Sequence, residues 1–160
     1  MKLPQALLSA MQRRAERRMD TPPSKRIGER YLTRWHLLPK NRLFNVYLHH
    51  VQEDDPDSHL HDHPWLFNIS VVLRGRISET LPSKTRVLEP GSITARMSRA
   101  PHRLDLLSVD SVTVFLTGPK IRDWGFYTEK GWVDSQRYLQ ANGDGRAVSQ
   151  DYTARQAPRH

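Results

Sequence analysis

Three alternating histidines mark residues 58–65, which read Ser58-His59-Leu60-His61-Asp62-His63-Pro64-Trp65. Side chains two residues apart on a β-strand point to the same face, so this spacing predicts a row of imidazoles on one strand. Two neighbouring members of such a row can bind one metal ion, because each nitrogen has to approach the ion to about 2.0–2.1 Å. All three rarely can, since the outer pair lies about 6–7 Å apart along the strand. One of the three is therefore expected to be a bystander.

A third ligand has to come from elsewhere in the chain, and composition limits its chemistry. The sequence has eight histidines and no cysteine, which excludes disulfides, thiolate nucleophiles and thiolate metal sites. His102, which follows Pro101, is the obvious candidate. Each piece alone also fits a role without metal, because a histidine pair on a strand is more often solvated or hydrogen-bonded than ligating.

From residue 31 onward, short segments rich in β-branched and aromatic residues alternate with turns. Glycine and proline stand in these turns, as in Arg74-Gly75 and Pro90-Gly91. Many short strands at regular spacing predict an all-β sandwich or barrel. The expected strands cover residues 44–50, 67–74, 77–80, 85–88, 92–96, 103–107, 112–117 and 124–128.

The N-terminal segment has a different pattern, in which leucine, methionine and alanine recur every four residues. This predicts an amphipathic helix of about four turns that ends at Thr21-Pro22-Pro23. Residues 1–26 carry seven basic and two acidic side chains, which is +5 of the chain's net charge of +8. Three alternatives stay open for this basic arm: packing on the barrel or a second subunit, contact with nucleic acid or an anionic membrane surface, or a frayed state. Nucleic-acid binding is expected only through the arm, because the rest of the chain is mildly basic.

A short helix is expected at residues 135–141, capped by Asp134 or Ser135 and ended by Asn142-Gly143. We therefore divide the chain into a basic helical arm at 1–26, a β-barrel domain at 27–142 and a flexible tail at 143–160. No apolar run is long enough for a membrane span, and the N-terminus lacks the apolar core of a signal peptide. A cytoplasmic protein is the expectation.

The intervals around the histidine pair follow a known pattern. Five residues separate Asp55 from His61, four separate His63 from Asn68, and six separate Asn68 from Gly75. The first motif of the cupin superfamily, commonly Gly-x5-His-x-His-x4-Glu-x6-Gly, has the same intervals. The chain keeps both histidines and the final glycine, but it has an aspartate for the first glycine and an asparagine for the glutamate.

A second set of intervals follows fifteen residues after Gly75. Gly91, Met97, Arg99, His102 and Leu106 keep the spacing of the second cupin motif, commonly Gly-x5-Pro-x-Gly-x2-His-x3-Asn. Only the first glycine and the histidine of that motif are present. The chain thus resembles the cupin superfamily over roughly residues 44–118, and wider segments around Trp35, Trp65 and Trp124 are similar to a group of uncharacterised bacterial and phage cupin-like metal-binding proteins.

The resemblance implies a double-stranded β-helix, or jelly roll, with an N-terminal helix and a short C-terminal helix. It also implies that His61, His63 and His102 hold one divalent metal ion near one mouth of the barrel, which leaves His59 as the bystander. Because Asn68 replaces the usual glutamate ligand, the simplest site has three neutral histidines. Two positive charges on the metal then favour an anionic substrate or a bound hydroxide. Three-histidine cupin sites resemble those of Fe²⁺ dioxygenases, so Fe²⁺ is the first choice, with Zn²⁺, Ni²⁺ or Mn²⁺ as alternatives.

Three functions stay open. The first is an Fe²⁺ three-histidine dioxygenase that acts on a small, anionic molecule. The second is a metal-dependent isomerase or lyase, in which Glu79 or Tyr47 moves a proton as the catalytic residue. The third is a non-catalytic module that binds a small ligand in the barrel. A homodimer formed through a sheet edge or the N-terminal arm is compatible with each of them.

Overall fold

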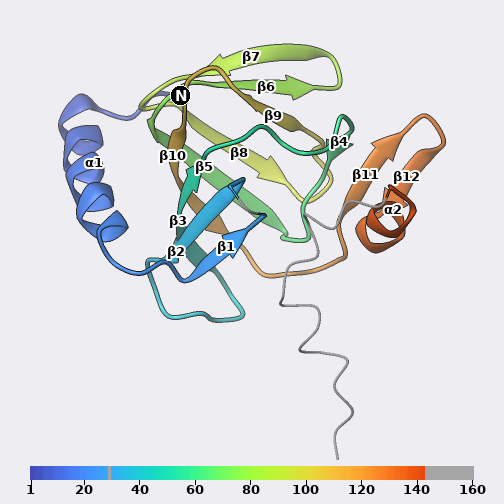
Figure 1. Ribbon diagram of the computed structural model, residues 1–160, viewed down its shortest axis with the longest axis horizontal. Helices are drawn as coiled ribbons and strands as arrows, with labels where there is room; N and C mark the ends of the chain where they lie inside the picture. Colours follow the sequence, from blue (N-terminus) through green and yellow to red (C-terminus); the bar gives the residue numbers. More distant parts are fainter. Residues whose placement is uncertain (29, 143–160) are drawn as a thin grey trace, which may run out of the picture.

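The computed structural model describes residues 1–28 and 30–142, so the predicted tail at 143–160 lies outside the described residues. Within them, helices α1 (Gln5–Met19) and α2 (Ser135–Asn142) flank a β-structure (Figure 1). The first six strands are β1 (Lys25–Ile27), β2 (Leu32–His36), β3 (Asn45–Val51), β4 (Leu60–His61), β5 (Phe67–Arg74) and β6 (Ile77–Leu81). The others are β7 (Lys84–Leu88), β8 (Ile93–Met97), β9 (Arg103–Leu106), β10 (Ser111–Thr117), β11 (Gly125–Thr128) and β12 (Gly131–Asp134).

The strands form one large and two small sheets, and every pairing is antiparallel. The large sheet has the order β1-β2-β3-β10-β5-β8, and the small sheets have the orders β12-β11-β4 and β7-β6-β9. Figure 1 shows the β7-β6-β9 sheet above the large sheet and the β12-β11-β4 sheet beside it. From β3 onward, neighbours in the large sheet are far apart in sequence, as expected for a jelly roll. The predicted all-β fold is therefore confirmed.

The two faces of the large sheet have different partners. On its outer face, Leu48 and Leu73 pack with Leu8 and Ala15 of α1 in one hydrophobic cluster. On its inner face, Val72 packs with residues of the β7-β6-β9 sheet in a second cluster. The adjacent side chains of Val72 and Leu73 on β5 thus point to opposite faces of the sheet, because side chains alternate along a strand.

The basic arm lies against this outer face. Burial of Leu8 and Ala15 sets the position of α1, while Arg13 and Arg17 on other sides of the helix are exposed. Ahead of the helix, Lys2 pairs with Ser92 at the start of β8. Of the three alternatives for the arm, packing on the barrel is the arrangement that the structure shows.

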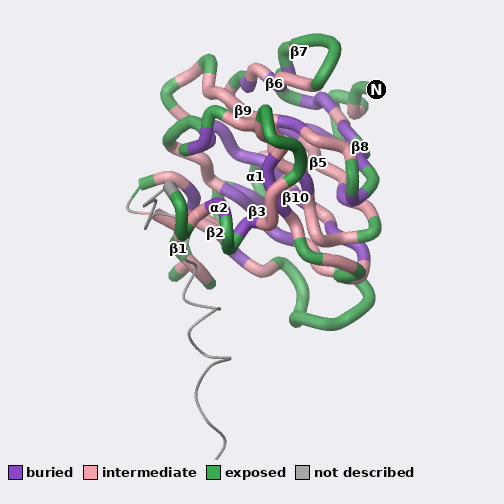
Figure 2. The backbone as a smooth tube through the Cα atoms, turned by 90° about the vertical axis from the view of Figure 1, so that its right-hand side faces the viewer, coloured by how far each residue is buried: buried purple, intermediate pink, exposed green. Residues whose placement is uncertain are grey.

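Burial follows the strands of the barrel, while the connection between β2 and β3 is exposed (Figure 2). Residues 37–44 between β2 and β3 are exposed throughout. Neither of the helices in the described part of the chain is long and apolar enough to cross a membrane.

The predicted turn glycines stand where the backbone requires them. Gly75 and Gly91 have φ values of 79° and 84°, in the left-handed region that glycine tolerates best. A Cβ atom on Gly75 would lie 2.1 Å from the carbonyl oxygen of Asp110. The turn between β5 and β6 therefore depends on glycine for both conformation and space.

Three strands differ from the prediction. Strands β1, β2 and β12 were not expected, because their short sequences have no clear alternation of apolar and polar residues. The expected row of histidines was only partly correct, since β4 spans two residues and ends at His61. His63 lies beyond the strand, in a segment that contacts the β8–β9 connection.

Candidate metal centre

Two of the three predicted metal ligands face each other as a backbone pair. The amide of His61 donates to the carbonyl of His102 at 2.9 Å, and the amide of His102 donates to the carbonyl of His61 at 2.9 Å. Residues paired in this way place their side chains on the same face of an antiparallel pair. Accordingly, the centroids of the two imidazole rings lie 4.9 Å apart.

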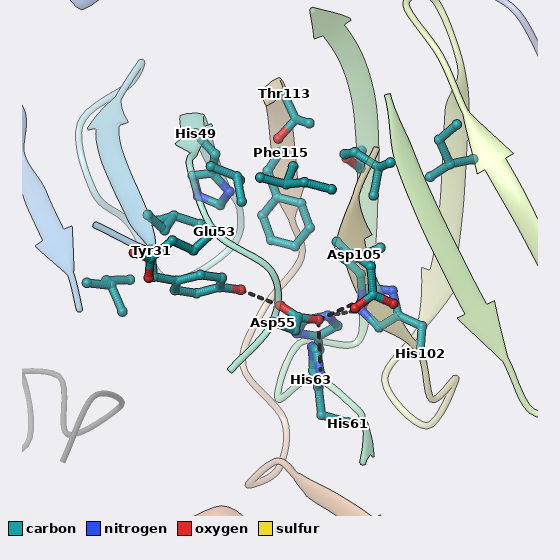
Figure 3. A pocket seen from close by; sticks show the side chains of 18 of the residues that line it. Tyr31, His49, Glu53, Asp55, His61, His63, His102, Asp105, Thr113 and Phe115 are labelled. Carbon is teal, nitrogen blue, oxygen red and sulfur yellow. Dashed lines mark hydrogen bonds and ion pairs between the residues drawn. The ribbon is translucent and has the colours of Figure 1, made fainter. Parts of the chain in front are cut away.

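His63 completes the group from the segment after β4. Its amide donates to the carbonyl of Ser98 at 3.2 Å, which ties this segment to the end of β8. One ring nitrogen from each of His61, His63 and His102 lies within 4.8 Å of the other two (Figure 3). The closest pair is Nε2 of His63 and Nε2 of His102, at 2.8 Å.

His59, the expected bystander, lies outside this group. Its Nδ1 is 2.8 Å from the hydroxyl of Tyr138 in α2, and its ring packs edge-on against the tyrosine ring. The structure thus places His59 at the contact between the β4 segment and the C-terminal helix.

The ionisation of the histidines suits metal binding. Burial lowers the pKa of His102 from 6.5 to about 4, although the hydrogen bond with Glu79 acts in the opposite direction. Burial, followed by repulsion from His102, also lowers the pKa of His63 well below 6.5. Both rings are therefore neutral at pH 7, which is the form that binds a metal ion.

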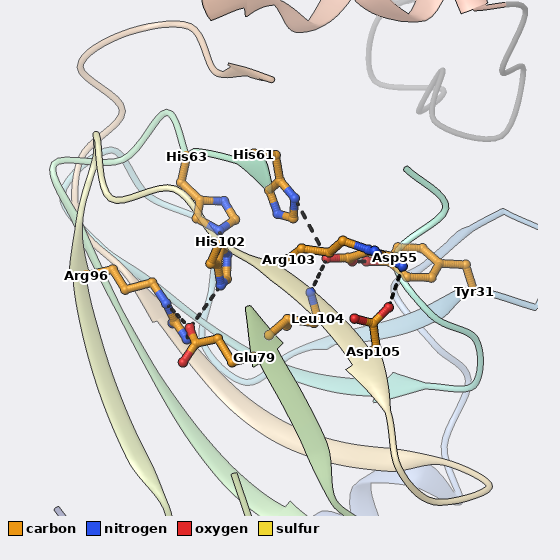
Figure 4. A network of polar contacts seen from close by, with 10 residues as sticks. All are labelled: Tyr31, Asp55, His61, His63, Glu79, Arg96, His102, Arg103, Leu104 and Asp105. Carbon is orange, nitrogen blue, oxygen red and sulfur yellow. Dashed lines mark hydrogen bonds and ion pairs between the residues drawn. The ribbon is translucent and has the colours of Figure 1, made fainter. Parts of the chain in front are cut away.

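Glu79 of β6 lies behind His102. Its Oε1 is 3.1 Å from Nδ1 of His102, and its side chain has no exposed surface (Figure 4). An ionised carboxylate can only accept a hydrogen bond, so the proton of neutral His102 is assigned to Nδ1. Nε2 of His102 then carries the lone pair that faces His63. A carboxylate behind a metal-binding histidine fixes the tautomer and orientation of its ring in this way.

Two arginines hold Glu79 as a carboxylate. Arg96 forms a buried ion pair with Oε1, and Nε of Arg86 donates to Oε2 at 2.6 Å. Burial opposes the ionisation of Glu79, but the hydrogen bond with His102 and the charge of Arg96 outweigh burial and lower its pKa to about 2. Glu79 lies outside the three-histidine group, and its oxygens point to His102, Arg96 and Arg86.

Asn68, at the position of the usual glutamate ligand, is also outside the three-histidine group. Its side chain is fully buried on β5, and its Oδ1 lies 3.4 Å from Nη1 of Arg96 on the neighbouring strand β8. The carboxylate of Glu79 thus comes from β6 and reaches the ring from behind, whereas no carboxylate of the described residues joins the group itself.

Tyr47, the second predicted catalytic residue, is buried on the inner face of β3 and is not among the described residues that line the cavity. Its ring stacks on that of His49 with centroids 5.8 Å apart, and the Arg34 guanidinium lies 4.7 Å from its centroid. His49 does line the cavity, and its Nε2 accepts a hydrogen bond from Nε of Arg34 at 2.9 Å.

Sequence reasoning missed Asp62, which stands between two of the histidines and points the other way. It is fully buried, and its carboxylate accepts hydrogen bonds from the amide of Gly125 at 2.8 Å and from Nη1 of Arg122 at 2.5 Å. Nε1 of Trp132 also donates to it, at 3.1 Å. Asp62 therefore joins the histidine segment to the β11–β12 hairpin. In the sequence, the one sign of this role is its position between His61 and His63, because alternation along a strand turns its side chain away from theirs.

A cavity of about 170 Å³ opens beside the three histidines inside the barrel (Figure 3). The β7-β6-β9 side supplies an apolar wall, formed by Ile77, Leu88, Leu104 and Leu106. The lining also carries charges of both signs, from Arg34, Arg96, Glu53, Asp55 and Asp105. The three imidazoles thus face a small compartment with one apolar side and one polar side.

No family model and no curated protein matches the chain. Among solved structures, KdgF from Halomonas sp. is 17% identical with a TM-score of 0.53, over 64% of this chain and 92% of that chain. An uncharacterized conserved protein with a double-stranded beta-helix domain from Klebsiella pneumoniae is 16% identical with a TM-score of 0.51, over 63% and 88% of the two chains. Likeness at this identity shows the fold and not the activity. Together with the antiparallel sheet order, it shows that the chain has a double-stranded β-helix fold.

Proposed function

We propose that the protein binds one divalent metal ion through His61, His63 and His102 and acts as a metal-dependent enzyme on a small molecule. The observation that carries this proposal is the convergence of three ring nitrogens beside a cavity. Neutral imidazoles suit iron, zinc, nickel and copper, so the donor set fits a divalent transition metal. Three protein ligands leave coordination positions for a substrate.

Our first choice of reaction is oxygen-dependent oxidation with Fe²⁺. When bound, iron supplies the redox chemistry, while the residues of the chain position the reactants. Glu79 orients His102, and the apolar wall around Leu104 limits the access of water to the site. A cavity of about 170 Å³ restricts the substrate to a small molecule.

The arrangement supports an isomerase or lyase less well. Such an enzyme needs a base that can accept a proton near neutral pH. Glu79, with a pKa of about 2 and two arginine partners, is held as a carboxylate and is a weak base. Tyr47 is not among the described residues of the cavity wall. The contacts of both residues therefore favour roles other than proton transfer.

We expect an anionic substrate because the metal ion carries two positive charges. Three neutral histidines do not compensate these charges, and the Glu79 carboxylate is already paired with Arg96 and Arg86. An anionic group on the substrate would supply the missing charge at the open positions.

The test starts with protein purified without oxygen, whose metal content is measured by mass spectrometry. We expect about one iron per chain and oxygen uptake with thiol or phenolic acids. Replacing His61, His63 or His102 by alanine should abolish metal binding, whereas His59→Ala should retain it. Zinc or nickel without oxygen uptake would favour the isomerase or lyase. Absence of any metal, with no loss of stability in the histidine variants, would leave a ligand-binding module.

A further inference from the structure

Asp55 lies behind His61 much as Glu79 lies behind His102 (Figure 4). This aspartate precedes β4 and is buried, with 6% of its side chain exposed. Its Oδ2 lies 3.7 Å from Nδ1 of His61, which is an electrostatic contact rather than a hydrogen bond. Nδ1 is thus the ring nitrogen of His61 that faces a negative charge.

The carboxylate of Asp55 is held by contacts that do not involve any histidine. Oδ2 accepts a hydrogen bond from the amide of Leu104 at 2.7 Å, and the amide of Asp55 donates to the carbonyl of Leu104 at 3.0 Å. The hydroxyl of Tyr31 donates to Oδ1. These contacts join Asp55 to β9 and to the start of β2, so its position is fixed by the barrel.

We propose that Asp55 is a positioning residue for His61, an inference that rests on the proposed metal site. A negative charge next to Nδ1 stabilises the tautomer with its proton on that nitrogen. The lone pair then lies on Nε2, at the opposite side of the ring, where it can take part in the three-histidine group. Asp55 and Glu79 thus each orient one of the two ligands that face each other across the His61–His102 bridge.

This role gives a physical reason for one departure from the cupin motif. The first position of that motif is commonly glycine, which has no side chain that can reach a ligand. This chain has Asp55 at that position and Asn68 in place of the ligating glutamate. Compared with the common motif, negative charge is therefore absent from the metal ligands and present in a group behind them. Carboxylates behind histidine ligands raise the basicity of the rings and stabilise metal binding.

The chain offers a matched control for testing Asp55. Asp54 accepts a hydrogen bond from the amide of Leu106 at 2.6 Å, so it contacts β9 in the same way, without an ion pair to a histidine among the described residues. Asp55→Asn and Asp54→Asn each remove one charge and keep an oxygen that can accept the amide hydrogen bond. Both variants are first compared with the wild type by thermal unfolding, to show that the barrel is formed.

Two measurements then test the inference separately from the metal. In the metal-free protein, nitrogen NMR of the His61 ring should show a proton on Nδ1 in the wild type and in Asp54→Asn, and a shift towards Nε2 in Asp55→Asn. In a titration with Zn²⁺ alone, Asp55→Asn should bind about 10–100-fold more weakly, and Asp54→Asn should bind as the wild type does.

The outcomes distinguish the two proposals. A wild type that binds neither zinc nor iron overturns the proposed metal site, while the NMR measurement still reports on Asp55. An unchanged tautomer, or a zinc affinity equal to that of Asp54→Asn, overturns the role of Asp55. If Asp55→Asn does not fold, Asp55→Ser removes the same charge with a smaller side chain. That variant should shift the tautomer in the same direction, and an unchanged His61 ring would again contradict the proposal.

Discussion

Replacing Glu79 by glutamine should strongly destabilise the barrel, because the carboxylate is the charge partner of a buried arginine. The side chain of Arg96 is 5% exposed and that of Glu79 has no exposed surface. Removing one partner of a buried ion pair leaves the other charge uncompensated, at a cost of about 3–5 kcal/mol. The contact with Arg86 adds little, because the Arg86 side chain is 40% exposed.

The lowered pKa of Glu79 gives a second estimate of this loss of stability, and the two estimates have the same size. Lowering this pKa from 4.5 to about 2 corresponds to about 3 kcal/mol of stability at neutral pH. A carboxyl group with a lowered pKa contributes this stability above pH 4.5, and the contribution is lost as the pH falls from 4.5 towards 2. Glu79→Gln should therefore lower the free energy of unfolding at pH 7 by about 3–5 kcal/mol. The melting temperature should fall by about 10 °C.

Urea unfolding at pH 7, followed by tryptophan fluorescence, measures this change. Glu89→Gln is the matched control, because the Glu89 side chain is 52% exposed and contacts Lys2 and Arg76 only at 3.5 and 3.8 Å. The control should lose less than about 0.5 kcal/mol. The double variant Glu79→Gln/Arg96→Met removes the uncompensated charge and should be more stable than Glu79→Gln alone. A loss of less than about 1 kcal/mol in Glu79→Gln, or no recovery in the double variant, would refute the reasoning.

Three further predictions concern the metal, the pH and a turn. Zn²⁺ at a hundred times its dissociation constant should stabilise the wild type by about 2.7 kcal/mol; thermal unfolding should show no such effect in His102→Ala and a full effect in His59→Ala. Because the pKa of His102 is about 4, the unfolded chain binds a proton that the folded metal-free protein excludes. His102 alone should therefore lower the unfolding free energy by about 2 kcal/mol as the pH falls from 6.5 to 5, and His102→Gln should weaken this pH dependence in urea titrations. Gly75→Ala should cost about 2–5 kcal/mol, since it combines a positive φ with a Cβ contact at 2.1 Å. Gly131→Ala, whose Cβ would meet nothing within 4 Å, should cost about 1–2 kcal/mol in the same assay.

The double-stranded β-helix could be predicted because its signals are local. Glycine at positions 75 and 91 marks turns that need a left-handed backbone, and the strands between such turns are short and contain β-branched residues. The intervals between motif positions also predicted which three histidines lie together. The initial argument from alternation was less accurate, since His63 lies outside β4 and reaches the group through its contact with Ser98.

The groups behind the histidines could not be predicted in the same way, because they depend on the register between strands. Glu79 pairs with Leu104 across β6 and β9, and this register places its carboxylate behind the ring of His102. Asp55 is held near His61 by the backbone of Leu104 and the hydroxyl of Tyr31. Neither register is visible in the periodicity of one strand. Glu79 was therefore expected to move a proton, whereas its contacts favour an orienting role.

The contacts of Glu79 also help to decide whether a chain with Asn68 in place of the ligating glutamate still has a metal site or has lost it. Burying a carboxylate is unfavourable unless ion pairs and hydrogen bonds compensate it, and Glu79 needs two arginines for this purpose. Its Oε1 nevertheless also contacts Nδ1 of His102, on the side of the ring away from His63. A barrel stabilised by the arginine pairs alone has no need of that third contact. This contact directs the lone pair of His102 towards His63. The arrangement therefore favours a site that binds metal through three histidines over a site that no longer binds metal.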